Sequence, residues 1–444
     1  MKFSKQLIAC AVVAGLAAPM SAFATNGYFS HGYSAKSKGM AGGGSALPQD
    51  AMIAADNPAG MVKVGERMEL GLSLFSPSDR GYETGAIQGS PPPGFPNFAL
   101  EPGNYKSDND FFLIPHFAYN WMLNADSSIG VTVYGNGGMN TEYPSSNYTF
   151  TAGGPCQPGV FYCGTAGVNL EQLFTNVSYS RKINDKHSWG VSAILAYQRF
   201  EAKGLAAFGA FNFSNDPTKL SDNGTDTSFG YGAKLGWLGE VSPGLTLAAS
   251  YQTKMSMDEF SDYAGLFAEQ GGFDIPATWT LGLAWNITKS GTLTFDVQGI
   301  QYSDVKSIGN PLSKFSDPGC AAPPNNTGCL GGSDGAGFGW EDMTIYKLGY
   351  QWATSPTWTW RVGASMGDQP IPDSEVLFNI LAPGVMETHV TGGFTYTMAS
   401  NNEITFAAMY APENKVKGVN PLDGQTIELN MTQWELTASW GVKF

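Results

Sequence analysis

The chain has few charged residues and few long apolar runs. Asp, Glu, Lys and Arg make up 14% of its 444 residues, against roughly 25% in an ordinary soluble domain. No apolar run beyond residue 24 reaches the roughly 18 residues that a membrane-spanning helix needs. These two shortages argue against a bundle of transmembrane helices, a coiled coil and a charge-rich disordered chain.

Basic residues are the scarcer charge. The sequence has 24 Lys and Arg against 38 Asp and Glu, which gives a net charge of −14. Nucleic acids are held by basic patches, so this balance argues against nucleic acid as a partner.

Residues in catalytic patterns are also lacking. The four histidines are scattered, and no H-E-x-x-H motif occurs. Residues 331–335 and 363–367 match G-x-S-x-G, but neither match lies in a strand-to-helix pattern. We therefore expect no enzyme, no metal site and no other cofactor.

Glycine and aromatic residues are in excess. The chain holds 56 glycines, and aromatics make up 13% of its residues, while the mean hydropathy is only −0.15. A glycine-rich, aromatic-rich and charge-poor chain that is not oily is typical of a β-barrel in a membrane.

The first 24 residues have the pattern of an export signal. Two lysines precede an apolar run from Leu7 to Ala18, and Ala22-Phe23-Ala24 forms an A-x-A cleavage site. The alternative is lipidation at Cys10, which would leave almost no apolar core before that cysteine. We expect cleavage after Ala24, so that the mature protein is 25–444.

Four cysteines remain after export, in two close pairs: Cys156 with Cys163, and Cys320 with Cys329. An exported protein meets an oxidising compartment, so we expect disulfides, and local pairing is the simplest of the three connectivities. Zinc binding is the alternative, but neither pair has C-x2-C spacing.

Apolar and polar residues alternate strictly in the last segment of the chain. Leu436 and Trp440 belong to one face, and Glu435 and Thr437 belong to the other. An apolar face toward lipid and a polar face toward a lumen is the pattern of a barrel strand, although one such segment would also fit a soluble sandwich. The same alternation recurs at 279–287, 293–297 and 404–410.

The turn signals give the number of strands. Six short turns lie at 124–126, 184–186, 242–244, 288–291, 355–356 and 400–402. Seven longer loops alternate with them at 77–109, 140–166, 204–225, 257–275, 305–339, 369–384 and 418–425. The sequence therefore predicts an all-β fold, a 14-stranded antiparallel transmembrane β-barrel over 63–444, located in a bacterial outer membrane.

Residues 25–62 do not alternate and are rich in Gly and Ala. They precede the first strand, which we expect at 65–76. A disordered periplasmic tail is the alternative, but a fourteen-strand barrel has room inside. We therefore expect an N-terminal luminal hatch, or plug.

Several motifs follow one another in a fixed order. Gly39–Ala46 and Asn57-Pro58-Ala59 lie in the hatch, and Asn136-Gly137-Gly138 lies in the third strand. Pro276–Trp279 opens the eighth strand, and Arg361-Val362-Gly363 lies in the eleventh. Over essentially the whole mature chain, this set resembles the FadL family of long-chain fatty-acid transporters, whose hatch ends in an Asn-Pro-Ala motif.

The resemblance implies a route for hydrophobic molecules. Family members capture substrate at outer loops, pass it inward by a hatch change and release it sideways at a kink in the third strand, here Asn136, Gly137 and Gly138. Paired glycines weaken ladder pairing; the alternative is that they ease packing against the hatch. The outer capture groove would include apolar residues of two loops, and the alternative is that these loops only fold onto each other. The residues are Leu205, Phe208, Phe211, Leu266 and Phe267.

A fatty acid needs a cation for its carboxylate as well as an apolar groove. Strand alternation places five cations in the lumen: Lys234, Lys254, Lys306, Lys347 and Arg361. With the resemblance, the candidate carboxylate-binding residues are Arg199, Lys203, Lys306 and Arg361; the alternative for each is an ordinary ion pair.

We therefore expect a monomeric channel for passive uptake of hydrophobic molecules. Long-chain fatty acids are the first candidate for its cargo, and aromatic or other hydrocarbons are the alternative. An outer-membrane enzyme and an aqueous porin are remote alternatives, since a porin needs an open lumen. The expected partners are the substrate, outer-membrane lipid and the barrel-assembly machinery, which reads a C-terminal strand ending in a residue such as Phe444.

Overall fold

The computed structural model describes residues 25–444 apart from 89–97, 150–156, 317–319, 321–325 and 400. The expected export signal over 1–24 therefore lies outside the described residues. No helix in the described part of the chain is long and apolar enough to cross a membrane.

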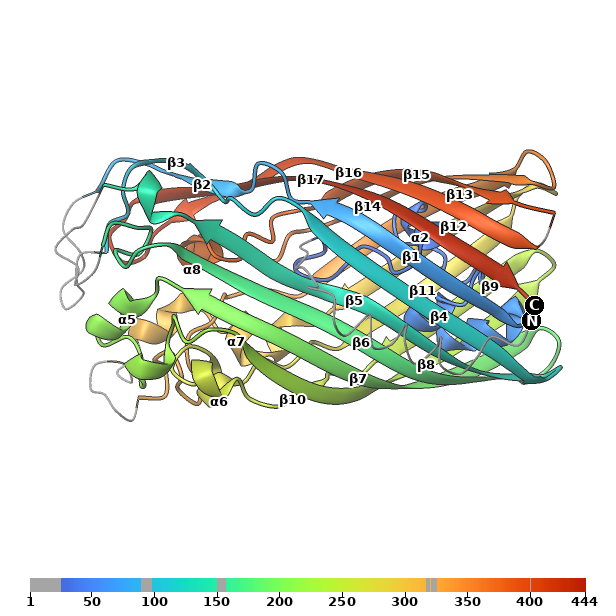
Figure 1. Ribbon diagram of the computed structural model, residues 1–444, viewed down its shortest axis with the longest axis horizontal. Coiled ribbons are helices and arrows are strands. Elements are labelled where there is room, and N and C mark those ends of the chain that lie inside the picture. Colours follow the sequence, from blue (N-terminus) through green and yellow to red (C-terminus); the bar gives the residue numbers. More distant parts are fainter. Residues whose placement is uncertain (1–24, 89–97, 150–156, 317–319, 321–325, 400) are drawn as a thin grey trace.

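Antiparallel strands close into one barrel (Figure 1). The first strand pairs with the last, from Arg67 opposite Lys443 to Ser76 opposite Trp434. The wall has fourteen strands, as the turn count predicts. They are β1 (Arg67–Ser76), β4 (Phe112–Asn124), β5 (Ser127–Tyr143), β6 (Ala166–Lys182), β7 (His187–Lys203), β8 (Asp226–Ser242), β9 (Leu245–Gln252), β11 (Thr278–Asn286), β12 (Gly291–Ile300), β13 (Met343–Ala353), β14 (Trp358–Gly367), β15 (Thr388–Thr397), β16 (Asn402–Val419) and β17 (Thr426–Lys443).

Three short segments continue the wall at its outer end. β2 (Gly81–Thr84) pairs with β17 and with β3 (Gly103–Lys106), and β10 (Ser256–Met257) pairs with β8. The loop expected at 77–109 therefore carries a strand pair of its own, because its residues extend the ladder of β17.

The two ends of the barrel differ. Tight turns gather at the end where the C-terminus lies, and the longer loops gather at the opposite end (Figure 1). Short helices thicken these loops: η2 (Ser145–Asn147), α5 (Ala206–Ala210), η3 (Pro217–Lys219), η4 (Ser261–Tyr263), α6 (Ala268–Gly271), η5 (Tyr302–Asp304), α7 (Lys306–Gly309), η6 (Leu312–Ser316), η7 (Asp373–Glu375) and α8 (Val376–Asn379). β5 runs to Tyr143, so the loop expected from 140 begins later.

The interior divides into an apolar outer half and a polar lower half. On β17 the inward-facing Leu429 and Met431 are fully buried near the outer end, whereas Glu435 and Thr437 are buried nearer the tight turns. On the lipid side, Leu436 is 53% exposed. The predicted polar lumen face is thus correct only for the lower half, because apolar loop side chains fill the outer half.

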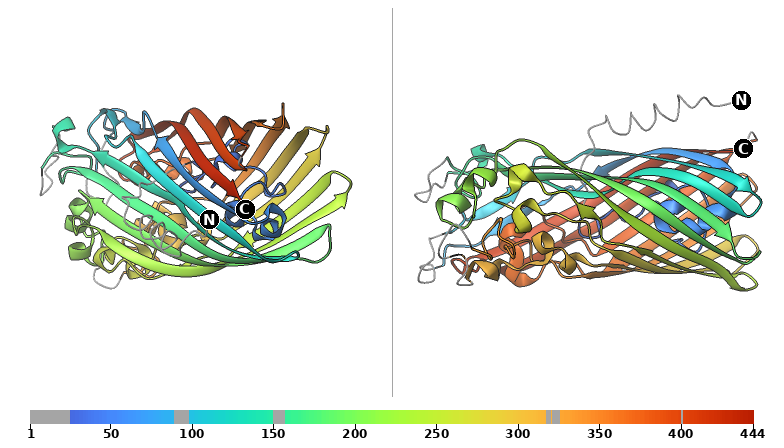
Figure 2. Two further views of the ribbon diagram at one scale, coloured as in Figure 1. Left: turned by 45° about the vertical axis from the view of Figure 1, so that its right-hand side comes forward. Right: turned by 90° about the horizontal axis from the view of Figure 1, so that it is seen from below.

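The hatch fills the polar half and lies inside the wall, where Figure 2 shows it in blue. It contains α2 (Ala35–Lys38), α3 (Ile53–Asp56), η1 (Pro58–Gly60) and α4 (Met61–Val64). Gly65 has a φ of 74°, a left-handed conformation that favours glycine, and it turns the chain into β1. The hatch thus runs to Val64, past the expected end at residue 62, and β1 begins at Arg67 instead of 65.

Candidate functional site

The Asn-Pro-Ala motif fastens the hatch to the wall. Asn57 begins η1, because its Oδ1 accepts a hydrogen bond from Ala59 N at 3.1 Å while Pro58 occupies the first helical position. The Asn57 Nδ2 then donates to the backbone oxygen of Trp237 on β8, at 3.0 Å. One amide side chain therefore both caps the short helix and docks it.

Small wall residues make this docking possible. The hydroxyls of Ser180 and Ser188 donate to Ala59 O at 3.1 and 2.8 Å. A Cβ at Gly236 would lie 2.1 Å from Asn57 Oδ1, so the wall needs a glycine there. The hatch motif is thus a structural contact between η1 and strands β6, β7 and β8.

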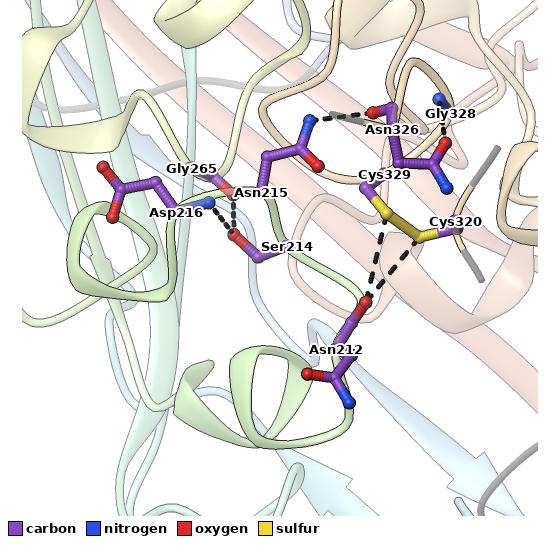
Figure 3. The surroundings of a disulfide bond; sticks show 9 residues. All are labelled: Asn212, Ser214, Asn215, Asp216, Gly265, Cys320, Asn326, Gly328 and Cys329. Carbon is purple, nitrogen blue, oxygen red and sulfur yellow. Dashed lines mark hydrogen bonds between the residues drawn. A yellow bond between two sulfur atoms is a disulfide. The ribbon is translucent and has the colours of Figure 1, made fainter. Parts of the chain in front are cut away.

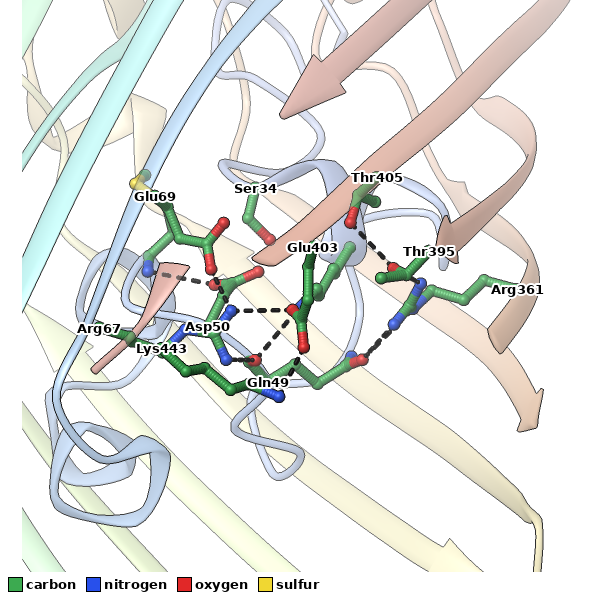
Figure 4. Close-up of polar contacts among 12 residues, drawn as sticks. Ser34, Gln49, Asp50, Arg67, Glu69, Arg361, Thr395, Glu403, Thr405 and Lys443 are labelled. Carbon is green, nitrogen blue, oxygen red and sulfur yellow. Dashed lines mark hydrogen bonds and ion pairs between the residues drawn. The ribbon is translucent and has the colours of Figure 1, made fainter. Parts of the chain in front are cut away.

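Buried charges hold the other side of the hatch (Figure 4). Glu403 of β16 accepts from Lys36 of α2 at 2.5 Å, from Arg67 of β1 at 3.0 Å and from Lys443 of β17 at 2.5 Å. Lys38 of α2 pairs in the same way with Glu435. The seam where the first and last strands meet is therefore also the seam where the hatch is bound.

The cations expected in the lumen divide into two groups. Lys234, Lys347 and Arg361 do face the lumen, and each is held by the hatch. Arg361 donates to Gln49 Oε1 at 2.8 Å and to Thr395 at 2.7 Å (Figure 4). It is buried beside the hatch, away from the apolar loops, so the structure does not place it as a carboxylate ligand there.

The other candidate cations lie on the outer surface. Arg199 and Lys203 share the outward face of β7, where they pair with Glu171 at 3.4 Å and Glu201 at 3.6 Å. Phe200 between them is the residue that points inward. Carboxylate binding by Arg199 or Lys203 stays a prediction, and it would have to take place outside the lumen.

Alternation predicts two further lysines in the lumen, but the strands that would carry them end before they are reached. β9 ends at Gln252, and Lys254 pairs with Asp274 at 2.8 Å, 45% exposed. β12 ends at Ile300, and Lys306 opens α7, where it pairs with Glu269 at 2.8 Å, 42% exposed. Both expectations of a lumen position are therefore wrong.

The third strand of the barrel breaks its pairing at the expected glycines. β5 pairs with β4 only as far as Tyr134 opposite His116, and its register against β6 shifts between Gly135 and Gly137. Along the described residues, the outer half of β5, from Gly135 to Tyr143, has no partner in β4.

The start of the hatch occupies the place that β4 leaves. Ser30 N donates to Asn136 O and Gly138 N donates to Tyr28 O, both at 2.9 Å. A Cβ at Gly137 would lie only 1.8 Å from Tyr28 O. Gly137 therefore fits both predicted roles. It lies at the shift in register, and its lack of a side chain leaves room for the backbone of the hatch.

The outer loops close over a small apolar pocket. Its cavity volume is about 30 Å³, far less than the roughly 150 Å³ of a cavity that holds benzene. A cargo molecule therefore needs these side chains to move. The lining is Val168, Phe200, Leu205, Phe208, Leu266, Phe267, Ser307, Leu330, Ala336, Gly337, Phe338, Phe378 and Leu381.

Four of the five groove residues expected from sequence line this pocket, and Phe211 does not. Phe211 instead packs on the same apolar cluster, 5.8 Å from the ring of Phe98. Sequence reasoning missed Phe338 and Leu381, which come from the loops at 305–339 and 369–384. The apolar run Ile380–Leu381 was a signal for the second of these loops.

A disulfide lies within one pocket loop, next to the loop that carries Asn212 (Figure 3). Cys320 and Cys329 are bonded, with a Cα–Cα distance of 5.0 Å, as predicted. Both sulfurs lie within 3.9 Å of Asn212 O, two residues beyond α5. Cys156 lies outside the described residues, so its pairing with Cys163 stays a prediction.

The two G-x-S-x-G matches do not form a hydrolase site. Residues 331–335 lie in a loop, and Ser365 lies within β14. Ser365 Oγ does lie 3.2 Å from His389 Nδ1, but both side chains are buried, and His389 Nε2 has no hydrogen-bond partner among the described residues to orient it.

Comparison with known proteins agrees with this geometry. A family model described as outer membrane protein transport protein (OMPP1/FadL/TodX) matches residues 15–439. The fold is similar to the Pseudomonas putida toluene transporter TodX, at 17% identity and a TM-score of 0.66, over 95% of this chain and 100% of that one. No curated protein matches the chain.

Two further solved structures share the fold. The Ralstonia pickettii toluene transporter TbuX has 16% identity and a TM-score of 0.60, over 93% of this chain and 99% of that one. A Pseudomonas aeruginosa FadL homologue has 15% identity and a TM-score of 0.63, over 96% and 100%. Because the family model spans nearly the whole sequence, the chain belongs to the FadL/TodX family of outer-membrane transport proteins, which are channels for hydrophobic compounds.

Proposed function

We propose that this channel takes up small uncharged hydrocarbons, aromatic ones above all, by passive diffusion. The observation that carries the proposal is the lining of the outer pocket: among the described residues, Ser307 is its one polar side chain and none of them is charged. An apolar cargo gains by leaving water for such a lining, whereas a carboxylate would lose its hydration without a partner.

Aromatic contacts support a route from the pocket to the interrupted strand. Phe338 of the pocket lies 6.3 Å from the ring of Trp340, which lies 5.9 Å from that of Tyr28. Tyr28 O in turn accepts from Gly138 of β5. We propose that cargo follows this line and leaves sideways where β5 lacks its β4 partner, once residues 28–30 have moved.

The hatch closes the direct route to the periplasm in this account. Its lower part is bound on opposite sides by Asn57 and by the Glu403 ion pairs. We propose that lateral release needs only the first residues of the hatch to move, because the backbone of 28–30 bonds the open edge of β5, with one side-chain contact from Tyr33 to Asn136. A single chain closes the barrel, so we propose that it works as a monomer.

Long-chain fatty acids are the second candidate cargo. Lys306 favours them, because it lies next to Ser307 of the pocket and is the candidate cation nearest to it in the sequence. Its ammonium already has two partners, Glu269 and Ser333 O, both at 2.8 Å. A carboxylate cargo would have to replace the first of them.

The test is paired uptake in cells that lack their own transporter and express this chain. We expect labelled toluene to enter faster than in cells with an empty vector, and labelled oleate to enter at the vector rate. A Phe208→Asp variant places a charge in the pocket and should abolish the gain, while Phe211→Asp beside the pocket is the matched control. Oleate uptake above the vector, with no gain for toluene, would favour the fatty-acid candidate.

A further inference from the structure

A left-handed turn lies in the loop that carries Leu266 and Phe267. Glu269 and Gln270 have φ values of 59° and 60°, and Gly271 follows at 109°. Residues other than glycine rarely adopt this conformation, and two in succession are uncommon. The turn therefore keeps this shape only while contacts around it outweigh the backbone cost.

Within its own loop the turn is held by the bond from Phe260 N to Gly271 O, at 2.9 Å. The contacts that Glu269 and Gln270 make outside the loop come from one neighbouring stretch and one lysine. Glu269 N donates to Gly332 O at 2.7 Å, and the Gln270 side chain donates to Gly331 O at 3.3 Å. Lys306 Nζ donates to Glu269 Oε1 and to Ser333 O, each at 2.8 Å. The lysine thus ties the strained turn to the loop at 331–333.

The residues next to these contacts form the apolar pocket. Leu266 and Phe267 precede the turn, Ser307 follows Lys306, and Leu330 precedes the loop at 331–333. Ser307 Oγ also donates to Gly272 O at 2.5 Å. The turn, the lysine and the loop therefore meet above the pocket and close it from the outside.

The closing contacts are weak ones. The Lys306 and Glu269 side chains are 42% and 56% exposed, whereas Phe267 beneath them is 4% exposed. An ion pair in water contributes little, and a turn with a backbone cost opens readily once it is freed. Such an arrangement is suited to opening and closing during each passage of cargo.

We propose that Glu269, Gln270 and Lys306 form an entry gate that sets the rate at which cargo reaches the apolar pocket. This inference rests on the proposed function. The three residues do not line the apolar pocket, so they would act by controlling access to it. The contacts of Lys306 hold the gate closed, so we call this residue the latch. The unfavourable backbone conformation of Gln270 destabilises the closed state and lets the gate open.

The gate predicts opposite effects for two single substitutions. Lys306→Met removes the latch, so toluene uptake should rise about threefold. Gln270→Gly removes the backbone cost of the closed turn, so uptake should fall about threefold. Residues with a merely structural role would not shift the rate in opposite directions.

Matched controls exist on the same chain. Lys314→Met breaks the Lys314–Asp334 pair in the same long loop but at no pocket-lining residue. Asn401 has a φ of 59° at the opposite end of the barrel, and Asn401→Gly removes the backbone cost of that left-handed conformation. Neither should change toluene uptake when the amounts of folded protein in the outer membrane are equal.

A second measurement needs no cargo. Val168 lines the pocket from the rigid strand β6 and is 4% exposed. In the purified full-length protein, a maleimide should label Val168→Cys faster when Lys306→Met is added and slower when Gln270→Gly is added. Equal labelling rates in all three backgrounds would overturn the gate.

The two measurements separate the proposals. Shifted labelling without toluene uptake by any variant, the unsubstituted chain included, would refute the hydrocarbon function and leave the gate standing. Shifted labelling with equal uptake rates would show that opening does not set the rate of entry, and would refute the inference itself.

Discussion

Replacing Glu403 by glutamine removes the carboxylate that three cations share. Lys36 and Arg67 keep only 5% and 2% of their side-chain surface exposed, while Lys443 is 45% exposed. Arg67 retains a second carboxylate, Glu69. Among the described residues, the hydrogen-bond partner that Lys36 retains is the backbone oxygen of Gln49, at 3.2 Å. The substitution therefore leaves the buried ammonium of Lys36, on α2 of the hatch, without the carboxylate of Glu403.

The size of the effect follows from that stranded charge. Breaking a buried ion pair by removing one partner costs about 3–5 kcal/mol, and every 1.4 kcal/mol is tenfold in an equilibrium. Local release of α2 should therefore become about 10²–10³ times more frequent. Replacing both partners, in Glu403→Gln with Lys36→Met, should restore most of the loss because no charge is left unpaired.

The assay is trypsin cleavage after Lys38, which is buried in the closed hatch and retained in both variants. When opening is fast relative to cleavage, the cleavage rate follows the population of the released state. Glu428→Gln, which breaks the exposed Lys415–Glu428 pair, is the control and should change the rate little. Cleavage of Glu403→Gln within threefold of the unsubstituted protein would refute the reasoning.

Four further predictions follow from single contacts. Asn57→Ala removes the cap of η1 and the bond to Trp237 O, so hatch docking should weaken by about 1–3 kcal/mol, measured by urea unfolding. Gly137→Val must displace Tyr28 O, so amide exchange at Ser30 and Gly138 should speed up at least tenfold, and unchanged protection would contradict the close approach. Cys329→Ser opens the bridge to Cys320, so cleavage after Lys314 should accelerate as about 2–3 kcal/mol of loop ordering is lost. Burial raises the pKa of Glu375 in the outer loops, so its contribution to stability is complete below about pH 4.5 and is lost as pH rises through the raised value; Glu375→Gln should flatten that pH dependence of thermal unfolding.

The strand count could be predicted because it depends on local signals. Outward-facing residues such as Leu436 and Trp440 alternate with inward ones over whole strands, and each tight turn carries its own Asn, Gly or Pro. The apolar outer half of the lumen could not be predicted in this way. Leu429 and Met431 point inward there because loops far away in the sequence cover them.

The candidate cations show where alternation fails. It holds for Lys234 and Lys347, which lie within strands. It fails for Lys306, because the strand before it ends at Ile300 and the chain then turns into short helices. The resemblance predicts Arg199 as a carboxylate-binding residue, whereas the alternation along β7 points Phe200 beside it inward. The partners of these groups, such as Gln49 for Arg361, lie in the hatch and depend on the folded barrel.

The central claim is that this plugged barrel passes hydrophobic molecules and excludes water-soluble ones. The most direct measurement is the initial entry rate of labelled toluene beside that of a small labelled sugar, in cells that express this chain and lack their own transporter. We expect a gain for toluene over the empty vector and none for the sugar, because the described parts of the hatch and outer loops pack inside the barrel. Equal gains for both molecules would show an aqueous pore and contradict the account.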